Sequence, residues 1–325
     1  MKMKRTATLC LLILLLLPGP ALARQPRIGL CLYSGKDTFI SSLSNEIRTR
    51  MQGQAELDIV YAQSDQNTQN DQVLAMLKSG HDLLIVNPVD RTSAVYLIRL
   101  AKQYGVPVIF INREPLREDL DSYAGAYYVG IDPKQQGQLQ GELAARYFGL
   151  HPEADRNGDG VIQLVLLRGE PGHQDAELRS LYAMRTLADS GLKVEKLGEE
   201  VASWDKALGQ EKLSVLLNSF GNRIECVLAN NDDMALGAID ALKAAGYFTP
   251  GKSIPVIGVD ATAPALEMVA QGPLYGTVQN DAQAQARAAV DLAMLLASGR
   301  AVTQDNYAFV MENKVVYIAS KAISR

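Results

Sequence analysis

The chain has 325 residues, of which 47% are hydrophobic and 21% are charged, and its formal net charge at pH 7 is −4. A chain of this length can bury two hydrophobic cores. Its acidic balance argues against nucleic-acid binding, because nucleic acid requires a basic protein face.

The first 23 residues have the pattern of an export signal. MKMKR is basic, TLCLLILLLLPGPALA is apolar, and Ala21-Leu22-Ala23 supplies the small residues that precede signal-peptidase cleavage. The apolar run is too short for a comfortable transmembrane helix. Cys10 lies inside that run and not at its end, which argues against lipid attachment. We predict cleavage near Ala23, and loss of the segment's three cations changes the net charge from −4 to −7.

Two cysteines, Cys31 and Cys226, remain in the predicted mature chain. Each lies inside an apolar, strand-like run, and they are far apart in the sequence. We therefore predict two buried free thiols and no disulfide.

The mature chain alternates short apolar runs with longer amphipathic ones. The first set has predicted strands at 27–33, 56–62, 82–88 and 106–112 and predicted helices near 39–51, 68–79 and 93–104. After YYVGID the pattern restarts, with strands at 161–167, 193–198, 225–230 and 254–260 and helices near 134–148, 175–190, 205–218 and 232–245. Near-continuous Val, Ile and Leu runs are typical of parallel sheets covered on both faces. Two successive sets predict an α/β fold of two doubly wound lobes.

Polar side chains follow the predicted strands in both sets. They are Asp37, Asn112, His173, Asp175, Arg179, Asn230, Asn231, Asp232, Asp260, Asn280 and Asp281. Ligands of open α/β sheets bind beyond the carboxyl ends of the strands, so a ligand between two lobes would meet these residues. The alternative is that Asn and Asp simply favour turns and helix N-caps, an interpretation that we prefer for Asn230, Asp232 and Asp281.

This set of polar groups suits a polyhydroxylated ligand, because each sugar hydroxyl is both a donor and an acceptor. The apolar face of a pyranose also requires flat rings, for which Phe39 and Trp204 are the candidates. Trp204 is the only tryptophan and lies in the polar run ASWDK. A core position for its side chain remains the alternative.

The run DRNGDGVIQ, residues 155–163, resembles the first nine positions of a calcium loop. Such a loop ends with a bidentate Glu at position twelve, but Leu166 occupies that position here. The run is therefore either an acidic surface turn or a site completed by a carboxylate from elsewhere in the chain.

Nearly all of the mature chain resembles the bacterial periplasmic glucose/galactose-binding protein family. The resemblance is carried by KDTFIS, QNDQ, DSYAGAYYVG, GEPGHQDAELR, ANNDDMALGA, GVDA and TVQND. It implies two lobes joined by three hinge strands that close on one hexose. The implied N-terminal lobe comprises residues 24–130 and 282–314, and the implied C-terminal lobe comprises residues 131–281 and 315–325. Gln174 replaces the family's usual proline, and the tail after VVYIAS is dissimilar.

The resemblance also implies the ligands of two sites. Phe39 and Trp204 would sandwich the sugar ring, and the other implied sugar contacts are Tyr33, Asp37, Asn112, His173, Asp175, Arg179, Asn231, Asp260 and Asn280. The missing calcium carboxylate would come from Glu225. The implied calcium ligands are then Asp155, Asn157, Asp159, Gln163, Glu225 and the carbonyl of Val161. All are hard oxygen donors, as calcium requires.

We therefore expect a monomeric periplasmic protein that delivers a monosaccharide to the permease subunits of an inner-membrane ABC transporter. Delivery to a chemoreceptor and the choice between glucose and galactose remain open. A glycosidase is disfavoured because the carboxylates are interleaved with Asn, Arg and His. A repressor is disfavoured because a signal peptide replaces the helix-turn-helix. The same fold with another ligand, such as a pentose or a sugar-like signal molecule, remains the alternative.

Overall fold

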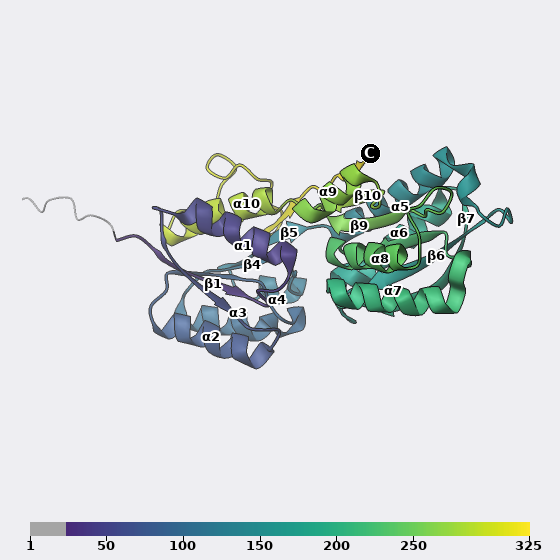
Figure 1. Cartoon of the computed structure of the whole chain (residues 1–325). Helices are drawn as coiled ribbons and strands as arrows, with labels where there is room; N and C mark the ends of the chain where they lie inside the picture. Colours follow the sequence, from purple (N-terminus) through teal and green to yellow (C-terminus); the bar gives the residue numbers. More distant parts are fainter. Residues whose placement is uncertain (1–23) are drawn as a thin grey trace, which may run out of the picture.

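A computed structural model describes residues 24–325, and the predicted export segment lies outside the described residues. Figure 1 shows two lobes side by side, each built on one sheet with helices on both faces. The predicted fold class is confirmed. Among the described residues, no helix is long and apolar enough to cross a membrane.

The N-terminal lobe contains a parallel sheet in the order β11-β5-β4-β3-β1-β2. Its strands are β1 (Arg27–Leu32), β2 (Glu56–Tyr61), β3 (Leu83–Val86), β4 (Val108–Ile111), β5 (Ala126–Ile131) and β11 (Val315–Ile318). Its helices are α1 (Thr38–Met51), α2 (Gln66–Lys78), α3 (Ala94–Tyr104), α4 (Arg117–Asp121) and α10 (Ala282–Ala297), with a short 3-10 turn at Arg91–Ser93.

The C-terminal lobe repeats this plan in the order β12-β10-β9-β8-β6-β7, with only β12 antiparallel to its neighbour. Its strands are β6 (Val161–Arg168), β7 (Lys193–Val201), β8 (Cys226–Ala229), β9 (Val256–Asp260), β10 (Gly276–Gln279) and β12 (Ala322–Ser324). Its helices are α5 (Pro133–Leu150), α6 (Gln174–Asp189), α7 (Lys206–Phe220), α8 (Asp232–Ala244) and α9 (Ala263–Gln271), with 3-10 turns at Pro152–Ala154 and Gly221–Arg223.

The central strands are buried at every residue, as their continuous apolar sequences predict. LLIV of β3, VIFI of β4 and CVLA of β8 show no exposed position. Helices α1 and α10 pack together against the N-terminal sheet, and α5 and α6 form the corresponding pair in the C-terminal lobe. Cys31 and Cys226 are free and buried, which confirms the prediction for both thiols. Burial raises the pKa of Cys31 to about 12.

The chain passes between the two sheets after β5, after β10 and between β11 and β12. The predicted assignment of residues 315–325 to the C-terminal lobe is wrong for β11, which pairs in parallel with β5. Val315, Val316 and Ile318 are buried there because they extend the apolar N-terminal sheet. Only β12 reaches the other lobe, where it pairs with β10.

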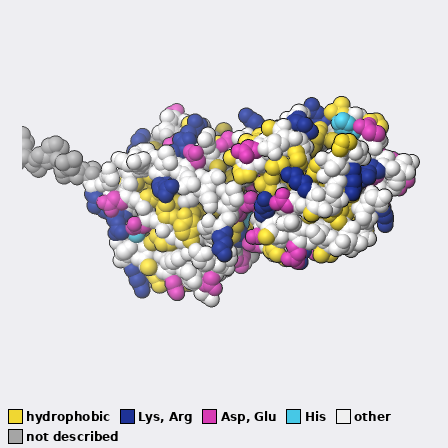
Figure 2. Space-filling view, in the orientation of Figure 1, with side chains coloured by type: hydrophobic (Ala, Val, Ile, Leu, Met, Phe, Trp, Pro, Cys, Tyr) yellow, Lys and Arg dark blue, Asp and Glu magenta, His cyan; other side chains and the backbone are white. Residues whose placement is uncertain are grey.

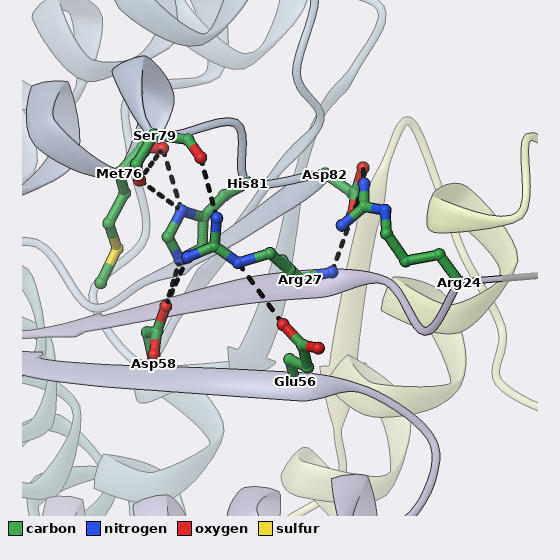
Figure 3. A network of polar contacts seen from close by, with 8 residues as sticks. All are labelled: Arg24, Arg27, Glu56, Asp58, Met76, Ser79, His81 and Asp82. Carbon is green, nitrogen blue, oxygen red and sulfur yellow. Dashed lines mark hydrogen bonds and ion pairs between the residues drawn. The ribbon is translucent and has the colours of Figure 1, made fainter.

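Ion pairs join the amino ends of the first N-terminal strands (Figure 3). Asp58 accepts hydrogen bonds from Arg27 at 3.2 Å and lies 2.9 Å from Nε2 of the buried His81. Asp82 accepts from the backbone N–H of Arg27 and from the Arg24 side chain. Because these contacts involve the starts of the strands, they leave the carboxyl ends free to face the other lobe.

Candidate functional site

All eleven predicted sugar contacts line one cavity between the lobes. The cavity has a volume of about 320 Å³, near the lower end of the range for small-molecule sites. Its lining residues are Tyr33, Asp37, Phe39, Asn112, Arg113, His173, Asp175, Arg179, Trp204, Asn231, Asp260 and Asn280. Figure 2 shows charged side chains of both signs near the junction of the lobes. The structure thus brings the predicted residues together, and their contact with a sugar stays a prediction.

Asp37 is held at the end of β1 by two kinds of contact. One carboxylate oxygen caps helix α1 by accepting from the backbone N–H of Ile40 at 2.8 Å. The other accepts from the Tyr33 hydroxyl at 2.7 Å. Since a carboxylate has about four lone-pair positions, Asp37 keeps acceptor capacity for a ligand hydroxyl.

Asn112 follows β4 with a φ of 61°, a left-handed conformation that non-glycine residues rarely adopt. The Tyr128 hydroxyl donates to its carbonyl at 2.8 Å, and Nδ2 of Asn87 donates to its side-chain oxygen at 3.1 Å. Asn87 and Tyr128 are both buried. These contacts fix the Asn112 amide, whose Nδ2 group remains available as a donor.

His173 is the N-cap of α6 and accepts the backbone N–H of Asp175 at Nδ1, 3.1 Å away. The ring proton therefore lies on Nε2. Burial lowers the pKa of His173 well below its ordinary value, and the positive charges of Arg113 and Arg179 lower it further. The imidazole is consequently neutral and offers Nε2–H as a hydrogen-bond donor.

Arg179 is a buried cation that organises the C-terminal wall of the cavity. Its guanidinium donates to Oε1 of Gln136 at 2.8 Å, to the carbonyl of Asn230 at 2.8 Å and to Asp175 at 3.2 Å. Burial raises the pKa of Asp175, and the charge of Arg179 opposes that rise. Two of the three contacts leave the ion pair fixed in one geometry, as a preorganised binding site requires.

Asp260 ends β9 and accepts from Nδ2 of Asn280 at 3.1 Å. Burial raises the pKa of Asp260 well above its ordinary value, while Arg179 acts in the opposite direction. A ligand hydroxyl that donates to this carboxylate would favour its ionised form. The residue thus gains more from a hydroxylated ligand than an exposed carboxylate would.

Trp204 belongs both to the C-terminal core and to the cavity wall, so the two alternatives for its side chain are compatible. The absence of a side chain at Gly169 makes room for the indole, since a Cβ there would lie 2.1 Å from a ring carbon. His173 packs edge-on against the indole at 5.0 Å. Phe39 comes from α1 in the opposite lobe.

The residues for which we preferred a local role lie outside the cavity lining. Asp281 caps α10, Asn230 bonds with Ser180, and Asp232 accepts from Thr277 at 2.6 Å. Asn231 does line the cavity, although its side chain also caps α8.

Arg113 is the cavity residue that the sequence analysis missed. Its guanidinium lies 4.0 Å from the centre of the Tyr33 ring and donates to the carbonyl of Val89. It also forms an ion pair of 3.1 Å with Glu170 of the other lobe. A second contact across the cleft joins the Thr38 hydroxyl to Asp233 at 3.0 Å. These contacts require the lobes to be close together, so the structure represents a closed arrangement.

The predicted calcium ligands gather at the start of β6, far along the strand from the sugar cavity. Glu225 is 1% exposed and accepts the backbone N–H groups of Arg156 at 2.6 Å and Gln163 at 3.1 Å. Nδ2 of Asn157 and Nε2 of Gln163 each lie 2.9 Å from Asp159. Within residues 24–325, however, no group of three or more His, Cys, Asp or Glu side chains has an arrangement that could hold a metal.

The donor set still fits a hard cation. Among the described residues, no Lys or Arg lies within ion-pair distance of Glu225, so its buried carboxylate has only backbone N–H partners. Two of the remaining predicted ligands are carboxylates, and three supply amide or carbonyl oxygens, which also suits calcium. These side chains would have to turn their oxygens towards the ion.

Two similar lobes that enclose one polar cavity define a two-lobed ligand-binding protein. The chain belongs to the periplasmic binding protein domain family, which matches residues 28–301. Because this is a family of binding proteins, the chain is not an enzyme.

Among individual proteins, the chain is 40% identical to the D-galactose/methyl-galactoside binding periplasmic protein MglB of Haemophilus influenzae, over 93% of this chain and 92% of that protein. It is 28% identical to the multiple sugar-binding periplasmic protein SbpA of Azospirillum brasilense, over 92% and 85% of the two chains. An ABC transporter solute binding protein from Bacillus halodurans C-125 with bound myo-inositol has a similar structure. Its TM-score is 0.78 at 29% identity, covering 92% of this chain and 94% of that one.

Proposed function

We propose that this chain is an exported periplasmic protein that closes on one monosaccharide, D-galactose or D-glucose, for uptake by an ABC transporter. The observation that carries the proposal is the single interlobe cavity lined by Asp, Asn, Arg and His side chains with Phe39 and Trp204. The printed name of the relative with 40% identity supports a galactose-type ligand.

The mechanism is closure of the two lobes around the sugar. The N-terminal lobe offers Asp37 and Asn112, and the C-terminal lobe offers His173, Asp175 and Asp260. Each hydrogen bond between a hydroxyl and a carboxylate is worth about 1.5–3 kcal/mol when water is excluded. After the costs of ordering and association, a net of roughly 8 kcal/mol corresponds to about micromolar affinity.

Specificity follows from the same groups. An epimer that misplaces one hydroxyl leaves a buried carboxylate or amide without its partner. We propose that the closed form is then read by transporter permease subunits, and a chemoreceptor is the further partner we propose. The protein acts as a monomer in this proposal.

We also propose a structural calcium ion at Asp155, Asn157, Asp159, Val161, Gln163 and Glu225. The support is the chemistry of the donors and the buried carboxylate of Glu225. When bound, the ion would neutralise three carboxylates of a loop that otherwise repel one another. Its role is to hold the start of β6 and the loop before it.

Calorimetric titration of the mature protein in calcium buffer with galactose and glucose tests the main proposal. We expect one-to-one binding near micromolar affinity and a loss of about 10- to 100-fold in Asp260→Asn, because a charge-assisted acceptor is removed. Asp305→Asn, at an exposed position, is the matched control. Tight binding of a pentose or of myo-inositol, with no heat from either hexose, would support the alternative ligand class instead.

A further inference from the structure

A second cavity of about 520 Å³ adjoins the sugar cavity between the lobes. We call it the side chamber, and its polar lining includes Arg91 and Glu114 of the N-terminal lobe and Glu170 and Gln174 of the C-terminal lobe. Arg113, His173 and Asp175 line both cavities. A ligand group that extends past these three side chains would therefore enter the side chamber.

Two polar atoms in this lining are buried without a hydrogen-bond partner among the described residues. They are Oε1 of Gln174, an acceptor, and Nε of Arg113, a donor. The other Arg113 nitrogens are occupied by the Val89 carbonyl and by Glu170. A buried polar atom without a partner is costly, so both atoms favour a ligand that can donate and accept.

The charged groups of the side chamber are already matched. Arg91 donates to the backbone carbonyl of Glu114 at 2.6 Å, and the Glu114 carboxylate accepts from Tyr317 at 2.9 Å. Arg117 also lies 3.4 Å from that carboxylate, and Arg113 pairs with Glu170. A charged ligand group would therefore find no unmatched partner, whereas a neutral hydroxyl can serve both free atoms.

We propose that the side chamber binds a hydroxylated substituent carried by the sugar, so that the ligands of this protein include O-glycosides with a small hydroxylated aglycone. This proposal rests on the proposed function and extends it. A methyl aglycone could not satisfy Gln174 or Arg113, because it has no hydrogen-bonding group. A hydroxyl group at that position donates to Gln174 and accepts from Arg113.

Calorimetry with galactose, methyl galactoside and 2-hydroxyethyl galactoside, each glycoside as both anomers, tests this proposal. We expect one hydroxyethyl anomer to bind more tightly than its methyl counterpart. Gln174→Leu should lower that affinity ratio by about two- to tenfold, the effect of one neutral hydrogen bond. Gln283→Leu, an exposed position outside both cavities, is the matched control and should leave the ratio unchanged.

The outcomes separate the two proposals. If galactose binds but both hydroxyethyl anomers bind no better than the methyl glycosides, the side chamber is not a subsite and the proposed function stands. An affinity ratio that is the same in Gln174→Leu and in the unmodified protein would also overturn the assignment. If no sugar binds to the folded protein, the proposed function fails and the side-chamber proposal fails with it.

Discussion

The Arg113–Glu170 ion pair is expected to hold the lobes closed, and its removal should shorten the lifetime of the complex. The pair joins a guanidinium of the N-terminal lobe to a carboxylate of the C-terminal lobe at 3.1 Å. It can exist only when the lobes are together. Glu170→Gln should therefore raise the rate constant of ligand dissociation and change the association rate constant little.

The burial of the two partners sets the size of the effect. The Arg113 side chain is 5% exposed, but that of Glu170 is 35% exposed, so water screens part of the attraction. Fully buried charge pairs are worth about 2–5 kcal/mol on truncation and exposed pairs about 0.2–1 kcal/mol. We take about 1–2 kcal/mol for this intermediate case, which corresponds to about 5- to 30-fold in the dissociation rate.

Stopped-flow tryptophan fluorescence can measure these rates, since Trp204 lines the cavity. Arg113 also touches the cavity, so a double-mutant cycle with Arg113→Gln and Glu170→Gln is needed to isolate the pair. Glu199→Gln breaks an ion pair with Arg168 inside the C-terminal lobe and serves as the control. Additive effects of the two cleft substitutions, or an unchanged dissociation rate in Glu170→Gln, would refute the latch.

Two further predictions concern stability. Burial raises the pKa of Asp232 to about 7, so the folded state binds more protons than the unfolded state between about pH 4 and 7. The free energy of unfolding should fall across that interval, by up to about 4 kcal/mol, and Asp232→Asn should flatten the fall in urea titrations at a series of pH values. An equal slope in both proteins would contradict this assignment. Calcium removal by a chelator should lower the melting temperature by several degrees, because a ligand at 1,000 times its Kd contributes about 4 kcal/mol. Glu225→Gln should abolish the chelator's effect, and an unmodified protein that is insensitive to chelator and to added calcium would exclude the ion.

The sequence predicts the scaffold and most of the cavity for the same reason. Continuous apolar runs such as LLIV, VIFI and CVLA identify strands that are covered on both faces. The polar residues directly after those runs then lie at the carboxyl ends of parallel strands, where ligands bind. Chain order alone thus places Asn112 and Asp260 at the same cleft, although they come from different lobes.

The tail could not be assigned in this way. VVYI of β11 has an apolar pattern that either edge strand would accept, because Val315, Val316 and Ile318 can be buried beside β5 or beside β10. The choice depends on how far the chain can reach after α10. That distance is a property of the assembled lobe and not of the local sequence.

Arg113 was missed because of a local departure from strand geometry. In an extended strand, neighbouring side chains point to opposite faces, so Asn112 and Arg113 should not both face one cavity. The φ of 61° at Asn112 reverses the chain direction and brings both side chains to the cleft. No periodicity in the sequence signals such a conformation.

The same left-handed backbone occurs at two other cavity residues, Trp204 with a φ of 66° and Asp260 with a φ of 122°. Glycine would adopt these angles at no steric cost, but it would supply neither the ring nor the carboxylate. Each non-glycine residue in this region costs about 1–3 kcal/mol and persists only where its surroundings enforce it. For Asp260 the enforcing contacts are the parallel pairing of β9 with β10 and the hydrogen bond from Asn280. The strain therefore lies at residues whose side chains the cavity requires, and the packed sheet beneath them supplies the stability that sustains it.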